Sequence, residues 1–201
     1  MHGAEYDEMV EAIDSYKDKF GSVAIAEPML GEVGDDATVI NDDKKAVAQA
    51  ITDAAVKEAG YDDMAAAAAD GVAFVFMGHG TSHTANVTYD QMQTQMENLG
   101  FTNAFIGTVE GEPEDTACEA VIEKVKDAGF KKVILRPLMV VAGDHANNDM
   151  AGDDEDSWKT QFVGSGAFDS VDVQIEGLGR IEAVEQLYVA HTKDAIDSIA
   201  K

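Results

Sequence analysis

The sequence predicts an α/β protein whose parallel sheet is covered by helices. Short apolar runs typical of buried strands alternate with helical patterns from Gly71 onward, and polar residues follow the ends of several runs. Strands separated by helices favour a parallel sheet with right-handed crossovers. We expect strands over residues 72–77, 104–109, 132–141 and 171–176, and helices over 85–99, 114–128, 155–162 and 181–200.

The first seventy residues are organised differently. A helical pattern over 5–20 ends at Gly21, a short strand follows over 22–30, and a second helix covers 42–59. Because one strand is not a sheet, either a preceding part is missing or this part completes its sheet with the rest of the fold or another subunit. An Ala-rich, acidic stretch then suggests a boundary. We expect an incomplete N-terminal α/β domain over 1–69 and a second over 70–201, with the final helix free to pack back on the first.

The charge of the chain disfavours several classes of partner. Its 39 acidic and 14 basic residues give a formal net charge of -25, which would repel nucleic acid and anionic membranes. Such a field attracts divalent cations, although acids spread over helix faces usually serve solvation. The sequence has no apolar run that could cross a bilayer and no apolar signal core, so we expect a cytoplasmic protein. The single cysteine, Cys118, is expected to be a buried structural thiol.

Three potential metal ligands follow three expected strands. His79 follows the run over 72–77, Glu110 follows 104–109, and His145 lies shortly after 132–141. If these strands are neighbours in a parallel sheet, their carboxyl ends meet at one edge, where open α/β sheets bind ligands. Two imidazoles and a carboxylate suit a first-row divalent metal and leave coordination positions free. For each residue taken alone, a surface or core role remains the alternative.

Familiar catalytic motifs are absent around these residues. The sequence Gly78-His79-Gly80 lacks the third glycine of a dinucleotide fingerprint, and no Walker lysine is present. His79 and His83 have the spacing of a zinc protease, but a glycine replaces the required glutamate. Ser82 lies outside a nucleophile elbow, and the acidic run over 149–156 has no glycine at the sixth position, where a calcium loop requires one.

Several longer stretches carry a family resemblance. The segments MGHGTSHTAN, GTVEGEP, LRPLMVVAGDHANNDMAGDDEDSWK and GLGRIEAV, in this order, resemble the anaerobic sirohydrochlorin cobalt chelatases of the CbiK family. These are class II chelatases, a group that also includes ferrochelatase. The resemblance implies two similar α/β domains with a cleft between them, and it implies that this chain lacks the family's N-terminal portion. It assigns the metal to His79, Glu110 and His145, and supporting roles to three neighbours, His83, Asn86 and Asp144.

The activity implied by the resemblance is insertion of Co²⁺ into a tetrapyrrole during anaerobic cobalamin biosynthesis. His79 and His145 are the expected catalytic residues, and His79 is the first choice as acceptor of a ring proton. Ni²⁺, Fe²⁺ or Zn²⁺ could occupy the same ligands. Two alternatives stay open: a truncated chelatase that binds metal or tetrapyrrole without turnover, and an iron chelatase for sirohaem. The expected partner is the small-molecule tetrapyrrole, and a homo-oligomer is compatible with the sequence.

Overall fold

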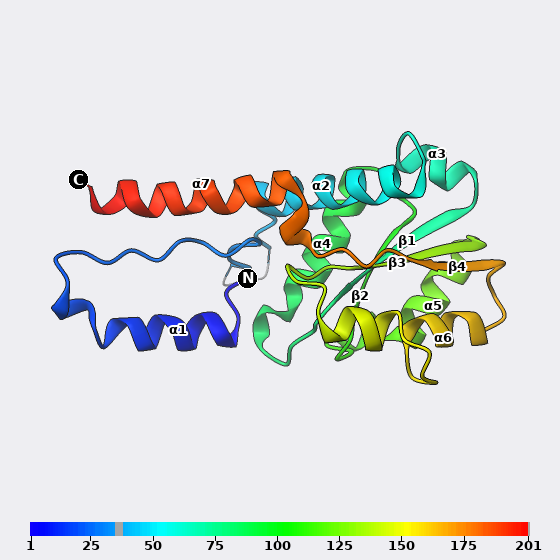
Figure 1. The fold of residues 1–201 in the computed structure, drawn as a ribbon, viewed down its shortest axis with the longest axis horizontal. Coiled ribbons are helices and arrows are strands. Elements are labelled where there is room, and N and C mark those ends of the chain that lie inside the picture. The colour runs from blue at the N-terminus through cyan, green and yellow to red at the C-terminus, as the bar shows by residue number, and fades with distance from the viewer. Residues whose placement is uncertain (35–37, 201) are drawn as a thin grey trace.

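A computed structural model describes residues 1–34 and 38–200 of the chain. Its centre is a parallel sheet with the strand order β2-β1-β3-β4 (Figure 1). The α/β class predicted from the sequence is therefore confirmed. The strands are β1 (Val72–Gly78), β2 (Ala104–Thr108), β3 (Lys132–Pro137) and β4 (Ser170–Val173).

Helices precede, connect and follow the strands. Local signals set several ends: Asn41 caps α2 by accepting a hydrogen bond from the Lys44 amide at 3.0 Å, and Gly60 ends the helix in the left-handed conformation. The α-helices are α1 (Ala4–Asp14), α2 (Asp42–Ala59), α3 (Met64–Ala69), α4 (Val87–Asn98), α5 (Cys118–Asp127), α6 (Trp158–Gly164) and α7 (Glu182–Ile199). Short 3₁₀ turns cover Lys17–Lys19, Thr84–Asn86, Glu114–Thr116 and Leu178–Arg180, and a π-helix covers His145–Met150.

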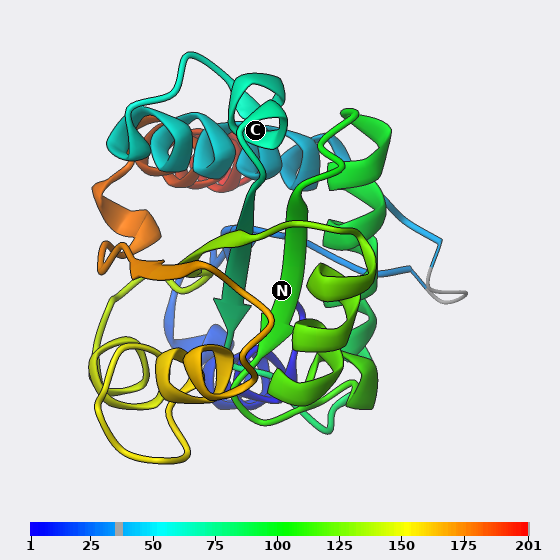
Figure 2. The same ribbon diagram turned by 90° about the vertical axis from the view of Figure 1, so that its right-hand side faces the viewer.

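Two apolar cores lie on the two faces of the sheet. Every residue of β1 is buried, which explains why its sequence is continuously apolar. On one face Phe74 and Phe76 share a core with residues of α2, α3 and α4, and on the other Val75 and Met77 share a core with α5 and α6. Figure 2 shows α2 and α3 on one side of the strands and α6 on the other.

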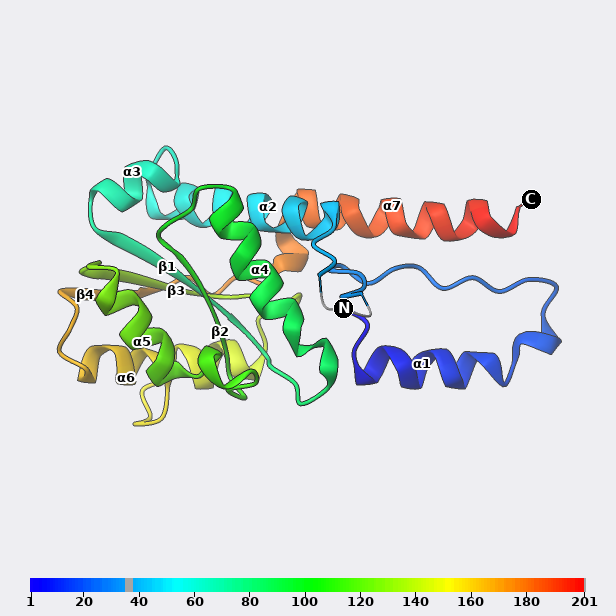
Figure 3. The ribbon, with the colours of Figure 1, turned by 180° about the vertical axis from the view of Figure 1, so that it is seen from behind.

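The first forty residues depart from the sequence prediction. Residues 22–28 are extended but form no sheet within the described ranges, so the expected strand over 22–30 is wrong. The physical reason is that a strand requires a partner, and none of the four described strands pairs with this segment. The expected helix over 5–20 ends at Asp14 and is followed by a 3₁₀ turn. Together with α7, α1 and this segment project from the sheet (Figures 1 and 3).

The final helix, α7, packs on α2. His191 on α7 is largely buried, and its Nε2 lies 3.2 Å from a carboxylate oxygen of Asp43 on α2. Because α2 itself shares a core with β1, packing joins residues 42–59 to the sheet. The division into domains at residue 69 stays a prediction.

Two further expectations concern Cys118 and membrane spans. Cys118 is buried at the start of α5, and burial raises the pKa of its thiol to about 12. The thiol is therefore protonated at neutral pH, as expected for a structural cysteine. Among residues 1–34 and 38–200, the helices are too short or too polar to span a bilayer.

A fully buried arginine joins three parts of the fold. Arg136 on β3 donates from Nη1 to Glu58 at 2.5 Å and to Gln174 at 2.7 Å, and from Nη2 to Glu176 at 2.7 Å. Glu58 belongs to α2, whereas Gln174 and Glu176 follow β4. The guanidinium thus connects β3 and the segment after β4 to α2, the helix that covers this face of the sheet.

Replacing Arg136 by alanine is expected to lower the free energy of unfolding by about 3 kcal/mol, because it leaves a cavity and removes the donor that Arg136 supplies to the buried Oε1 of Gln174. Arg136→Met, which keeps most of the volume and removes the charge, is expected to cost less. Urea unfolding of both variants and the parent measures this difference. Parental stability of Arg136→Ala would show that the network contributes nothing.

Candidate metal site

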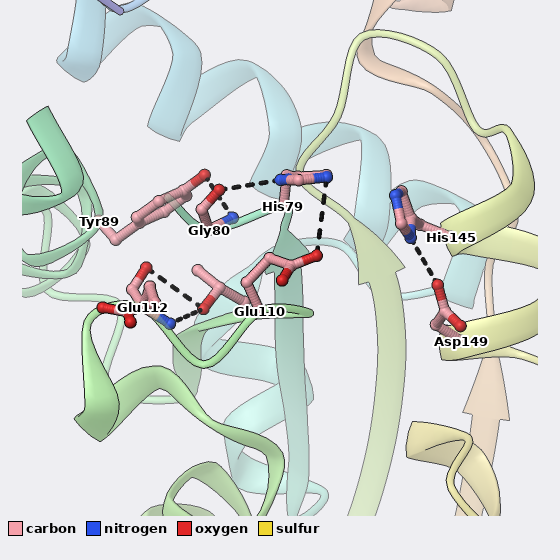
Figure 4. Close-up of polar contacts among 8 residues, drawn as sticks. His79, Gly80, Tyr89, Glu110, Glu112, His145 and Asp149 are labelled. Atoms are coloured by element: carbon pink, nitrogen blue, oxygen red, sulfur yellow. Dashed lines mark hydrogen bonds and ion pairs between the residues drawn. The ribbon is translucent and has the colours of Figure 1, made fainter. Parts of the chain in front are cut away.

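The pairing of β1 with β2 brings His79 and Glu110 to the same edge of the sheet. The last paired residues of the two strands are Gly78 and Thr108. Beyond them the Glu110 amide donates to the His79 carbonyl oxygen at 2.9 Å, so the backbone ladder continues to these two residues. Their side chains follow: His79 Nε2 lies 4.0 Å from Glu110 Oε1 (Figure 4).

His145 approaches from the other neighbour of β1. Strand β3 ends at Pro137, earlier than the expected residue 141, and an irregular stretch leads to the π-helix that begins at His145. The ring centroids of His79 and His145 are 4.8 Å apart, and the rings are nearly perpendicular at 79°. Two imidazoles and a carboxylate therefore converge at the carboxyl edge of the sheet. This arrangement is the one expected when the three strands are neighbours in a parallel sheet.

Both imidazoles are anchored through Nδ1. His79 Nδ1 lies 2.9 Å from the Gly80 carbonyl oxygen, and His145 Nδ1 lies 2.5 Å from Asp149 Oδ2 (Figure 4). A carbonyl or carboxylate oxygen can only accept, so these contacts place the proton of each neutral ring on Nδ1. The consequence is that both Nε2 lone pairs are available to a metal.

The spacing of the first two ligands fits a single ion. Ligand atoms that are each about 2 Å from one metal stand roughly 3 to 4 Å apart, close to the separation between His79 Nε2 and Glu110 Oε1. Within residues 1–34 and 38–200, however, no group of three or more His, Cys, Asp or Glu side chains forms a ready-made cluster. A shared coordination sphere thus requires adjustment of the side chains. All three are partly exposed, which leaves them room to turn.

The three residues expected to support the site follow or precede the two histidines in the chain and make contacts of their own. His83 accepts a hydrogen bond from the Ala85 amide through Nδ1, and its Nε2 lies 3.3 Å from Asp7 of α1. Asn86 directly precedes α4 without a side-chain cap bond, and Asp144 accepts from Asn148 at 2.6 Å. His83 thereby connects α1 to the loop after β1. The supporting roles stay predictions.

Sequence reasoning missed Asp149, the partner of His145. It lies four residues after His145, a spacing that brings side chains together on one helical face. In the sequence, Asp149 is apparent only as the first residue of the acidic run over 149–156, which lacks the spacing of a calcium loop. A carboxylate that holds the Nδ1 proton of a ligand histidine fixes its ring and raises its basicity toward a metal.

Asp149→Ala is expected to weaken Co²⁺ binding by about 10- to 100-fold, because His145 loses the group that orients it. Calorimetric titration of the purified chain with Co²⁺ measures the affinity. Asp153→Ala is the matched control, since Asp153 is an exposed acid that closely follows the π-helix and pairs with Lys159. Equal affinities of the two variants would remove Asp149 from the site.

A hollow borders the site on the side of α5 and α6. Its volume is about 350 Å³, and its lining includes Glu110, Asp149 and Trp158. A larger and more apolar hollow, of about 540 Å³, lies on the projection, where α1 and residues 22–24 meet Ile199 of α7. It contains none of the three potential ligands. We therefore place the candidate site at the edge of the sheet, where the chemistry converges.

Comparison with known proteins identifies the family of the chain. A family model described as cobalt chelatase (CbiK) matches residues 1–197. The chain belongs to the CbiK cobalt chelatase family. This finding confirms the resemblance carried by the strand-end motifs.

Two curated relatives are both named as sirohydrochlorin cobaltochelatases. The chain is 42% identical over 123 residues to a sirohydrochlorin cobaltochelatase of Salmonella typhimurium, covering 61% of this chain and 44% of the relative. It is 27% identical over 199 residues to sirohydrochlorin cobaltochelatase CbiKC of Nitratidesulfovibrio vulgaris, covering 98% of this chain and 62% of the relative. The matched region thus spans less than two thirds of each relative.

One solved structure supports the fold alone. It is a crystal structure of a protein described as a cobalamin (vitamin B12) biosynthesis CbiX protein, from Marinobacter aquaeolei VT8. The similarity has a TM-score of 0.50 at 13% identity, and it covers 65% of this chain and 98% of the other.

Proposed function

We propose that this CbiK-family chain inserts Co²⁺ into sirohydrochlorin in anaerobic cobalamin biosynthesis. The observation that carries the proposal is the convergence of His79, Glu110 and His145 at the carboxyl edge of the sheet, with both imidazole Nε2 atoms available. The names of the two relatives support sirohydrochlorin as the substrate and cobalt as the metal.

Metal insertion requires two tasks of these side chains. They hold the ion until the ring nitrogens replace them, and a base accepts the protons that leave the two pyrrole N–H groups. Imidazole suits both tasks near neutral pH. We assign the first proton to His79 once its Nε2 has released the metal, because a proton on this nitrogen would face Glu110 Oε1 at 4.0 Å and form an ion pair there. His145 and Glu110 would then release the metal to the ring, and the second proton would pass to the Nε2 of His145 that this release frees.

The net charge of -25 favours delivery of the cation. It does not select cobalt, since ligands of this type bind Ni²⁺ or Zn²⁺ at least as well as Co²⁺. We infer that supply determines the metal. An iron chelatase for sirohaem is distinguished by anaerobic competition between Co²⁺ and Fe²⁺: preferential formation of the iron product would replace cobalt in this proposal.

A second candidate function is binding of metal or tetrapyrrole without turnover. The observation that favours it is coverage, since the matched region spans 44% and 62% of the two relatives. In this second function, the cleft that accommodates the ring in a full-length enzyme includes residues beyond the matched region. Both candidates use the same three ligands and differ in catalysis alone.

The test is an anaerobic assay of the purified chain with sirohydrochlorin and Co²⁺, followed by the change in absorbance of the ring. A reaction without protein gives the spontaneous rate. A rate above this background, proportional to protein concentration, is the expected result. A background rate from a chain that binds Co²⁺ would favour the binding function, and absence of both would reject the metal site.

A further inference from the structure

A tyrosine outside the strand-end motifs contacts the loop that carries His79. Tyr89 lies on α4 and is buried, and its hydroxyl accepts a hydrogen bond from the Gly80 amide at 2.9 Å (Figure 4). Burial raises the pKa of Tyr89 above its ordinary value, although bonds from the backbone of Gly80 and His79 oppose this rise. The phenol is therefore neutral at physiological pH and can accept this bond while keeping its proton.

The loop around His79 fits closely between Tyr89 and β2. A Cβ atom on Gly78 would lie 2.5 Å from the Tyr89 ring, and one on Gly80 would lie 2.9 Å from Glu110 Cβ. Gly80 also has a φ of +93°, a conformation that L side chains rarely adopt. The backbone on either side of His79 is thus confined by Tyr89 on one side and by Glu110 on the other.

The hydrogen bonds of Gly80 connect Tyr89 to the imidazole. The Gly80 amide donates to the Tyr89 hydroxyl, while the Gly80 carbonyl oxygen lies 2.9 Å from His79 Nδ1. Gly80 is buried, so its amide has little access to water if the hydroxyl is removed. An unsatisfied buried amide favours rearrangement of the backbone, which would also move the carbonyl that holds the imidazole.

We propose that Tyr89 is a positioning residue for His79. Its hydroxyl fixes the orientation of Gly80, whose carbonyl keeps the His79 proton on Nδ1 and the Nε2 lone pair directed toward Glu110. The consequence for cobalt rests on the proposed function, whereas the effect on the imidazole does not. Tyr89 itself would touch neither the metal nor the ring.

The test compares Tyr89→Phe with the parent chain, without metal, by ¹⁵N NMR of the histidine rings. The parent is expected to show His79 with its proton on Nδ1, and the variant is expected to show a mixture of both tautomers. Tyr61→Phe is the matched control, because the Tyr61 hydroxyl donates to Asp70, and neither of these residues contacts the loop that carries His79. Unchanged circular dichroism of both variants would show that the fold is retained.

Titration with Co²⁺ gives a second readout, in which Tyr89→Phe is expected to bind about tenfold more weakly and Tyr61→Phe like the parent. An unchanged His79 tautomer in Tyr89→Phe overturns the positioning role, whatever the cobalt affinity. If the parent binds no cobalt but the tautomer changes in Tyr89→Phe, the metal site is rejected and the positioning role stands.

Discussion

His145→Ala is expected to reduce the rate of cobalt insertion into sirohydrochlorin by at least about 100-fold, the lower end of what a positioned acid–base group contributes. The substitution removes one of two imidazoles at the site and leaves Asp149 without the ring it orients. The side chain of His145 is partly exposed, so its loss should leave the apolar cores of the sheet intact. Insertion is measured anaerobically from the absorbance of the ring, after subtraction of the spontaneous rate.

His2→Ala is the control for this experiment. His2 stacks on Tyr6 and pairs with Glu27 in the N-terminal projection, so it makes contacts of its own without joining the candidate site. We expect this variant to insert cobalt at the parental rate. Parental activity of His145→Ala would exclude His145 from the mechanism. Cobalt insertion by the chain would still be established by that result.

Glu110→Gln is expected to weaken Co²⁺ binding by at least about tenfold, and to slow insertion, because a neutral amide replaces an anionic ligand of nearly the same shape. The backbone bond from the Glu110 amide to His79 does not involve the side chain and should persist. The variant therefore tests the charge of the carboxylate with little change in geometry. Calorimetric titration gives the affinity, and the absorbance assay gives the rate.

Glu112→Gln is the matched control for the second experiment. Glu112 lies two residues further along the same loop, is exposed, and bonds to Thr108 through its backbone. The two substitutions change the net charge equally, so any general effect of charge on cation binding appears in both. Equal affinities of both variants would show that Glu110 is not a ligand.

The candidate site was largely predictable from local sequence. The apolar run before His79 identified a buried strand, and helical patterns between the strands identified a parallel sheet. Parallel neighbours end at the same edge, so the residues after their ends converge. The same reasoning failed for residues 22–30, where an extended pattern has no neighbouring strand within the described ranges.

The sequence by itself determined the class of the fold and the three potential ligands, because buried strands, helical periodicity and strand ends can be recognised in short stretches of sequence. Only the tertiary structure decided which nitrogen of each imidazole is available. Asp149 and the Tyr89–Gly80 bond set this feature, and Tyr89 reaches the loop from a separate helix. A contact between a helix and a neighbouring loop depends on how the elements pack, and no local pattern specifies that packing.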